Sequence, residues 1–107
     1  MSELIEIHWT SGSIDEARKI SRYLVQEKLV ACAQIIPWIE SIYMWNGQME
    51  TAQESKIVCK SRMVHLEAIK QAIQMQSKYE IPEIICHVID DGNQPYLDWL
   101  QANTVKN

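Results

Sequence analysis

The chain has 107 residues, of which 47% are apolar and 22% charged, as is usual for globular proteins. Its 14 acidic and 10 basic side chains give a net charge of −4. This balance removes the general attraction to phosphate on which nucleic-acid-binding proteins depend. We therefore expect one domain over residues 1–107 that binds no nucleic acid.

The first residues are acidic and include no long apolar run, so they do not resemble a secretory signal. No segment approaches the length of a membrane span. Cys32, Cys59 and Cys86 are widely spaced and odd in number, which favours reduced thiols over a disulfide framework. These features predict a cytoplasmic protein that makes no contact with a membrane.

Residues 4–9 alternate between apolar and polar side chains, which predicts a half-buried strand with the odd-numbered residues on its inner face. Ser13 and Glu16 have the spacing of a capping box, in which each side chain bonds the backbone amide of the other residue. Helical apolar spacing follows them. We expect a helix that continues to about residue 28.

From residue 31 the sequence is typical of a strand again, and Pro37, which lacks an amide donor, predicts a bulge or bend. Asn46-Gly47 is the pair best suited to a type I′ hairpin turn. The turn sets the register of the returning strand. The expected pairs are Trp45 with Gln48, Tyr43 with Glu50 and Ser41 with Ala52.

The outer half of this hairpin, residues 38–45, is too apolar for a ribbon surrounded by water. An isolated two-stranded ribbon is also marginally stable at best. We expect another copy of the chain to cover it. The alternative is that the last helix folds back over it.

The second half of the chain predicts a helix over 62–77 with Ser61 as its cap, and a strand over 84–89 in a central position. A short last helix follows, capped by Asn93 with Pro95 just inside. The order β-α-β-β-α-β predicts an α+β, ferredoxin-like fold with one antiparallel sheet and two helices on one face.

Few residues suggest chemistry. Paired cysteines or histidines at metal-ligand spacing are absent, and His8, His65 and His87 have no partner near them in the sequence. Glu80 and Glu83 flank Ile81-Pro82, where they are either hard-cation ligands or solvated loop residues. No glycine-rich loop or nucleophile paired with a base is evident, so we expect no enzymatic activity.

The most specific signal comes from six segments in order: 27–33, 35–37, 41–43 with Trp45 and Gly47, 60–62, 79–84, and 96–97 with Trp99. Together they resemble the CutA divalent-cation tolerance family. The resemblance implies a ferredoxin-like fold with a long hairpin, assembled as a homotrimer similar to the PII signalling proteins. It also implies a role in tolerance of copper and other divalent cations.

The resemblance further implies a cleft between subunits. Its residues in this chain are Cys32, Trp45, Lys60, Tyr79, Glu80 and Trp99, a mixed apolar and charged set suited to a small ligand. Cys32 lies on the family's Ala-Cys position. Trp9, Gln76 and Ser77 stand where metal-binding members carry a thiol or imidazoles, so we expect no high-affinity metal site and at most weak binding of Cu or Zn.

Three alternatives remain. A sensor of the PII type would bind a small anionic effector in the cleft, with Lys60 or Arg62 supplying charge. An RNA-binding module would need stacking aromatic residues on the strand over 55–60, which has none. An acylphosphatase-like enzyme would need an arginine after the first strand, and residues 10–13 supply none.

Overall fold

The computed structural model describes residues 3–105 and has the α+β, ferredoxin-like architecture that the sequence predicts. In chain order the elements are β1 (Leu4–Ser11), α1 (Ile14–Gln26), β2 (Cys32–Trp45), β3 (Gln48–Arg62), a 3₁₀ turn (Met63–His65), α2 (Leu66–Gln76), β4 (Ile84–Val88) and α3 (Gln94–Ala102). The strands form one sheet in the order β2-β3-β1-β4, with antiparallel neighbours throughout. None of the helices within residues 3–105 has the length and apolar character that crossing a lipid bilayer requires.

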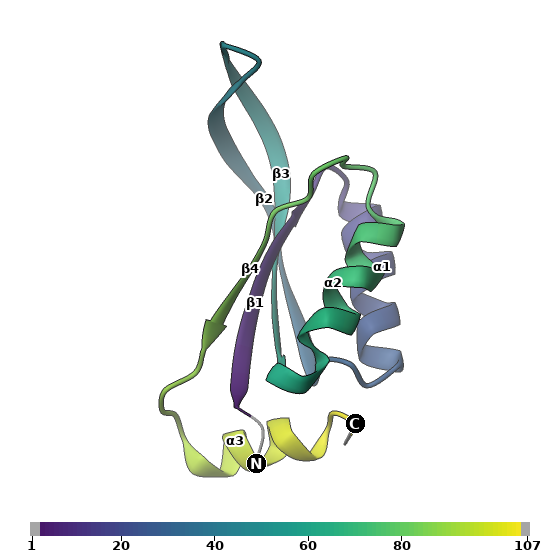
Figure 1. The fold of residues 1–107 in the computed structure, drawn as a ribbon, viewed down its shortest axis with the longest axis vertical. Helices are drawn as coiled ribbons and strands as arrows, with labels where there is room; N and C mark the ends of the chain where they lie inside the picture. Colours follow the sequence, from purple (N-terminus) through teal and green to yellow (C-terminus); the bar gives the residue numbers. More distant parts are fainter. Residues whose placement is uncertain (1–2, 106–107) are drawn as a thin grey trace.

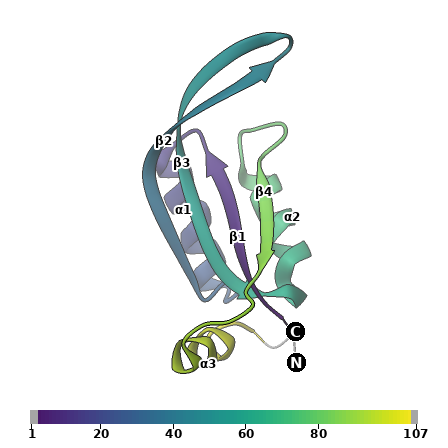
Figure 2. The same ribbon diagram turned by 90° about the vertical axis from the view of Figure 1, so that its left-hand side faces the viewer.

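Helices α1 and α2 cover one face of the sheet and leave the other face open (Figures 1 and 2). The core lies in this single layer between helices and strands. Ile5, Ile7 and Trp9 of β1 are fully buried there, against Ile20 of α1 and Ile73 of α2. Their two-residue spacing is the alternation that the sequence shows, because successive side chains of a strand point to opposite faces.

The start of α1 differs in part from the expected capping box. The Ser13 hydroxyl accepts a hydrogen bond from the Glu16 amide at 3.2 Å, as predicted. The Glu16 carboxylate does not bond back to Ser13. It accepts instead from the Ser11 hydroxyl at 2.5 Å and from the Lys78 amide at 3.0 Å. A carboxylate accepts several hydrogen bonds, and those to an ionised group are strong. The bond from Lys78 joins α1 to the segment before β4.

The hairpin of β2 and β3 has the predicted turn and register. Asn46 and Gly47 have φ values of 51° and 79°, as a type I′ turn requires, and the strands pair as expected from Trp45 with Gln48 onward. The register shifts between Ile36 and Ile39, so the bulge at Pro37 is confirmed. Pro37 has no backbone N–H to donate. Its carbonyl accepts a hydrogen bond from the Ser55 hydroxyl at 2.6 Å.

Three expectations for the second half of the chain are wrong: the Ser61 cap, the central position of the last strand and the side-chain cap at Asn93. Ser61 does not cap a helix, because β3 continues through Arg62 and the buried Ser61 hydroxyl donates to the Leu29 carbonyl. Strand β4 is an edge strand and not a central one, since β1 and β3 occupy the middle of the sheet. Ile85 and Val88 of β4 are accordingly each 45% exposed in the chain.

Helix α3 lies at the end of the sheet opposite to the hairpin (Figures 1 and 2). The alternative in which this helix covers the apolar hairpin is therefore wrong. Pro95 lies in its first turn as expected, but the Asn93 side chain makes no capping hydrogen bond. The segment after α3 is held by the buried Arg62, whose guanidinium donates to the Thr104 hydroxyl at 2.9 Å and to the Val105 carbonyl.

Candidate functional site

A pocket of about 510 Å³ runs along one face of the hairpin, from Glu54 near its base to Trp45 beside the turn, and polar and aromatic groups line it. The hairpin forms one wall, the end of β1 forms the floor, and the segment between α2 and β4 forms the other wall. The lining residues are Thr10, Tyr43, Trp45, Glu50, Glu54, Tyr79, Glu80, Ile81 and Glu83. The volume lies in the usual range for a small-molecule site, so this pocket is the candidate site.

Tyr79 connects the two walls. Its hydroxyl donates to the Glu54 carboxylate at 2.6 Å, and its backbone amide donates to the Ser77 hydroxyl at 3.1 Å. Burial of the ring and the bond to the Glu54 carboxylate both raise the pKa of Tyr79, because each disfavours the phenolate. Tyr79 is therefore a neutral hydrogen-bond donor at physiological pH.

The fit around Tyr79 depends on Gly12. A Cβ atom at position 12 would lie 3.0 Å from the Tyr79 hydroxyl oxygen and 3.4 Å from the ring. A glycine is needed there for this close approach, since any larger residue would have to move Tyr79. The turn between β1 and α1 thus helps to position Tyr79, which lines the pocket.

The six residues assigned to a cleft from the family resemblance form two groups within one chain. Trp45, Tyr79 and Glu80 line the pocket. Cys32 and Lys60 pair across β2 and β3 at the far end of the sheet, thirteen residues from Trp45 along β2, or roughly 40 Å of extended strand. Within one chain the two groups are too far apart to form one cleft, so only contact between two chains could join them.

The far group, beside α3, is a small aromatic cluster. The Cys32 thiol lies 3.7 Å from the Tyr96 hydroxyl, and the Tyr96 ring stacks on Trp99 with centroids 5.6 Å apart. Lys60 donates to the Gln34 side chain at 2.7 Å. Within one chain these residues form a continuous surface at the α3 end of the open sheet face.

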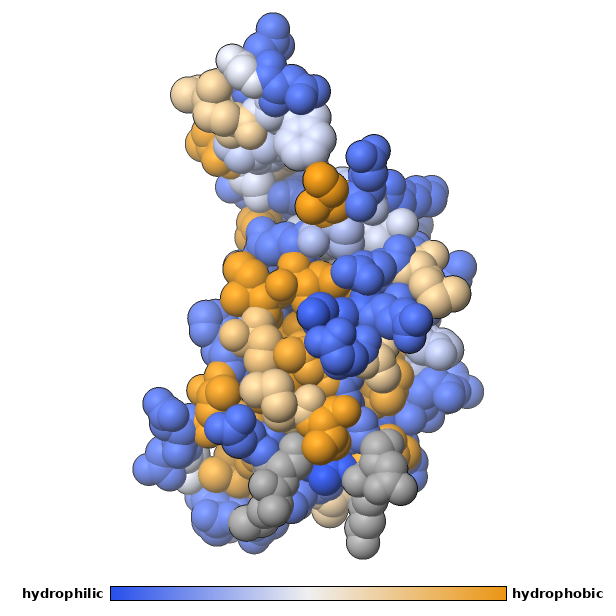
Figure 3. Space-filling view, in the orientation of Figure 1, coloured by the Kyte–Doolittle hydropathy of each residue, from blue (hydrophilic) through white to orange (hydrophobic). Residues whose placement is uncertain are grey.

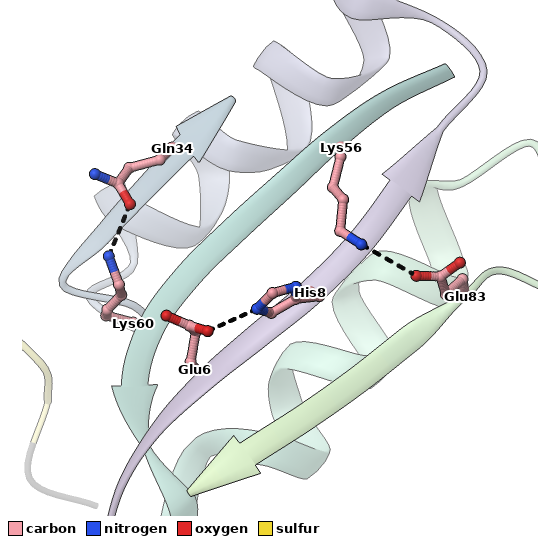
Figure 4. A network of polar contacts seen from close by, with 6 residues as sticks. All are labelled: Glu6, His8, Gln34, Lys56, Lys60 and Glu83. Carbon is pink, nitrogen blue, oxygen red and sulfur yellow. Dashed lines mark hydrogen bonds and ion pairs between the residues drawn. The ribbon is translucent and has the colours of Figure 1, made fainter. Parts of the chain in front are cut away.

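The open face also carries histidine contacts that the sequence analysis missed. The His8 ring lies 2.7 Å from a Glu6 carboxylate oxygen, and this hydrogen bond lowers the pKa of Glu6. His87 meets His8 edge-on, with ring centroids 5.3 Å apart. The signal in the sequence was the two-residue spacing of Glu6 and His8, which places both on one face of a strand. Figure 4 shows this pair with the Lys60–Gln34 bond and the Lys56–Glu83 ion pair, whose atoms are 4.0 Å apart.

The cysteines are poorly placed for metal. Cys59 is buried and accepts a hydrogen bond from the Trp9 indole at 3.4 Å, and burial raises its thiol pKa to about 12. Burial also raises the pKa of Cys86. A thiol ligates metal as its thiolate, so the raised pKa makes both thiols weaker ligands at neutral pH. Within residues 3–105, no three histidine, cysteine, aspartate or glutamate side chains are placed to hold one metal ion.

The fold and the site together define a class of protein: a ferredoxin-like domain with an overhanging β2-β3 hairpin and an acidic, aromatic pocket along one face of it. The family model described as "CutA1 divalent ion tolerance protein" matches residues 5–103. The chain belongs to this family. A "Divalent-cation tolerance protein CutA" from Thermus thermophilus is 38% identical over 104 residues, covering 97% of this chain and 99% of that protein.

Solved structures are similar over almost the whole chain. CutA1 from Oryza sativa has a TM-score of 0.96 at 31% identity, covering 99% of this chain and 97% of that one. The solved structure of a divalent cation tolerance protein from Thermus thermophilus has a TM-score of 0.92 at 35% identity, covering 95% of this chain and 99% of that one. The long hairpin is thus a property of the family fold.

The relatives differ in length and in the location that their names give. A chloroplastic CutA from Arabidopsis thaliana is 34% identical over 100 residues, which are 94% of this chain and 55% of that protein. The chain spans about half the length of the plant relatives that it matches. A structure from Archaeoglobus fulgidus is described as periplasmic. Family membership therefore does not fix a cellular location.

Proposed function

We propose that the protein is a homotrimer without enzymatic activity that takes part in tolerance of divalent cations, including copper, and binds its ligand near the hairpin. The observation that carries this proposal is the exposed apolar face of the hairpin. Ile42, Met44 and Met49 are 64%, 61% and 73% exposed in the single chain. Figure 3 shows hydrophobic surface on the hairpin and over the strands below it.

The two faces of the hairpin have different chemistry. Tyr43 and Glu50 pair with each other and line the pocket. Ile42 and Met44 alternate with Tyr43 and therefore point to the opposite face, away from the pocket. Covering a side chain of this size gains about 1.5–3 kcal/mol. A surface with several such residues favours burial, and another copy of the chain is the partner that is always present.

The number three comes from the resemblance to the family. The assembly that we propose covers the face of the hairpin that carries Ile42 and Met44, which is opposite to the face that lines the pocket. It would also provide the route by which the group around Cys32 in one chain could approach the group around Tyr79 in another. We keep a single domain over 1–107, a cytoplasmic location and the lack of nucleic-acid and membrane partners as predictions.

Direct metal binding is proposed to be weak. Trp9 occupies a position where metal-binding members have a cysteine, and it is fully buried against Cys59. Cys32 and Cys86 are both half-buried, but Cys86 packs against the core, which leaves Cys32 as the thiol that a metal could reach. One accessible thiol without converging partners supports micromolar or looser binding of copper or zinc and not a closed site.

A sensor of the PII type is the second candidate, because the pocket has the volume and lining of a ligand site. The two basic residues that were expected to hold an anionic effector bond to other groups of the chain. Arg62 is buried on Thr104 and Val105, and Lys60 bonds Gln34. This arrangement favours a ligand that the hairpin pocket recognises over an anion bound by those two residues.

Thermal-shift and calorimetric titrations of reduced protein test this proposal. We expect Cu²⁺ and Zn²⁺ to raise the melting temperature only at concentrations near or above micromolar, since a ligand stabilises the fold appreciably only when its concentration reaches or exceeds its Kd. A nanomolar site with one ion per chain would contradict the weak-binding proposal. It would mean that assembly brings together ligands that lie apart in one chain.

A further inference from the structure

The hairpin pocket carries negative charge. Four of its lining residues are glutamates: Glu50, Glu54, Glu80 and Glu83. None of the described lining residues is a lysine, arginine or histidine. Lys56 reaches Glu83 from outside the lining at 4.0 Å, and an ion pair this long and partly exposed neutralises little. A concave surface lined by one sign of charge concentrates ligands of the opposite sign.

The remaining walls are aromatic. Tyr43 and Trp45 come from β2, and Tyr79 comes from the segment before β4. The alternation of the hairpin places Tyr43, Trp45 and Glu50 on the same face, so rings and carboxylates line one space. Aromatic faces attract cations, and they also bury the apolar body that an organic cation carries. Neither property would be useful for binding an inorganic anion.

A bare metal ion fits this pocket less well than a larger cation. A divalent ion needs several oxygen atoms converging on one point at about 2.0–2.6 Å. Among the described residues, no three carboxylate, imidazole or thiol groups are placed in that way. The carboxylates are distributed along the pocket, two on the hairpin and two on the segment before β4.

We infer that the pocket between the hairpin and the segment before β4 binds an organic cation, with one or more ammonium groups on an apolar body. This inference rests on the proposed function, because it names the class of ligand for the same site. The carboxylates of Glu50 and Glu80 hold the ammonium groups, and the rings of Tyr43 and Trp45 cover the hydrocarbon. Glu54 is held by Tyr79 and orients that ring.

Calorimetric titration at low salt tests the inference with matched probes. The diamine cadaverine supplies two ammonium groups joined by five methylene groups, glutarate supplies two carboxylates joined by three methylene groups, and Mg²⁺ supplies a compact dication. We expect cadaverine to bind the wild-type protein and glutarate not to bind. Added salt should weaken the binding, because the pocket is open to solvent.

Variants locate the binding. Glu50→Gln and Glu80→Gln change exposed side chains, so the fold should persist, and each should weaken cadaverine binding roughly two- to fivefold. Trp45→Leu should weaken it by a similar factor. Glu67→Gln on α2 removes the same charge outside the pocket and should leave the affinity unchanged.

Three results would overturn the inference: no binding of cadaverine, equal binding of glutarate, or cadaverine binding that both glutamine variants leave unchanged. Binding of Mg²⁺ that these variants abolish, with no response to cadaverine, would replace the organic cation with a metal ion. The proposed function fails on different measurements, the mass of the assembly and the copper titration. The organic-cation inference and the proposed function can therefore be tested separately.

Discussion

The Tyr79 hydroxyl donates to the Glu54 carboxylate at 2.6 Å, which joins the segment before β4 to a strand of the hairpin across 25 residues of sequence. The same segment is held to α1 by the bond from the Lys78 amide to Glu16 at 3.0 Å. These two contacts fix the segment from both sides. The pocket wall that carries Glu80 is therefore preorganised before a ligand arrives.

The first prediction concerns this bond. Tyr79→Phe removes the hydroxyl and leaves the Glu54 carboxylate without that donor, which should lower the free energy of unfolding by about 1–2 kcal/mol. Urea unfolding at fixed protein concentration measures the loss. Tyr23→Phe is the control, because Tyr23 is exposed on α1 and should change stability little. Equal effects of the two variants would show that the Tyr79–Glu54 bond contributes nothing.

A second prediction concerns Gly12. Gly12→Ala places a Cβ atom 3.0 Å from the Tyr79 hydroxyl, so the ring must shift by a few tenths of an ångström, which disturbs its bond to Glu54. We expect the variant to be destabilised and the loss to be smaller when Tyr79 is already phenylalanine. A double-mutant cycle in urea measures this coupling, which for residues in contact is about 0.5–3 kcal/mol. Additive effects would contradict the contact.

Alkaline pH should destabilise the fold. Burial raises the pKa of Cys59 from 9.0 to about 12 and also raises that of Tyr79. Both groups are neutral when protonated, so at high pH the unfolded chain loses their protons first. Stability is then fully present below about pH 9 and declines as the pH rises further. Urea midpoints across this range should show the decline, and Tyr79→Phe should reduce its slope.

Local chemistry made much of the fold predictable. Asn46-Gly47 determined the turn, and because strand register follows from the turn, every pair out to Ser41 and Ala52 was predicted correctly. The roles of Glu16 and Ser61 were misinterpreted because they depend on residues far away in the sequence. Their side chains bond Lys78 and Leu29, which are remote in sequence, and no local pattern indicates such partners.

The residues of the candidate site were also predicted only in part. The family resemblance selected Trp45, Tyr79 and Glu80, which the fold brings to one pocket. It did not select Glu50 and Glu54, because their place in the pocket depends on the segment before β4 lying against this face of the hairpin, which the strand register alone does not indicate. The charge of the pocket, which decides the class of ligand, becomes visible only when these two glutamates are added.

The cysteines allow a prediction about metal binding. Cys32→Ser should weaken the binding of copper about fivefold or more, since Cys32 is the reachable thiol. Cys86→Ala is the control and should leave the affinity unchanged, because the Cys86 side chain packs against the core of the domain. Calorimetry on reduced protein measures both. An unchanged affinity in Cys32→Ser would remove Cys32 from the proposed metal ligands.

The central claim is that the apolar face of the hairpin is buried between copies of the chain. Light scattering of the purified protein at micromolar concentration tests it most directly, with Ile42→Asp as the variant and Gln74→Glu on the exposed side of α2 as the charge-matched control. An unpaired charge buried at an interface costs several kcal/mol. We expect three times the 12.5 kDa of one chain for the wild type and for Gln74→Glu, and a smaller mass or insoluble protein for Ile42→Asp. A monomeric wild type, or an Ile42→Asp variant that keeps the full mass, would contradict it.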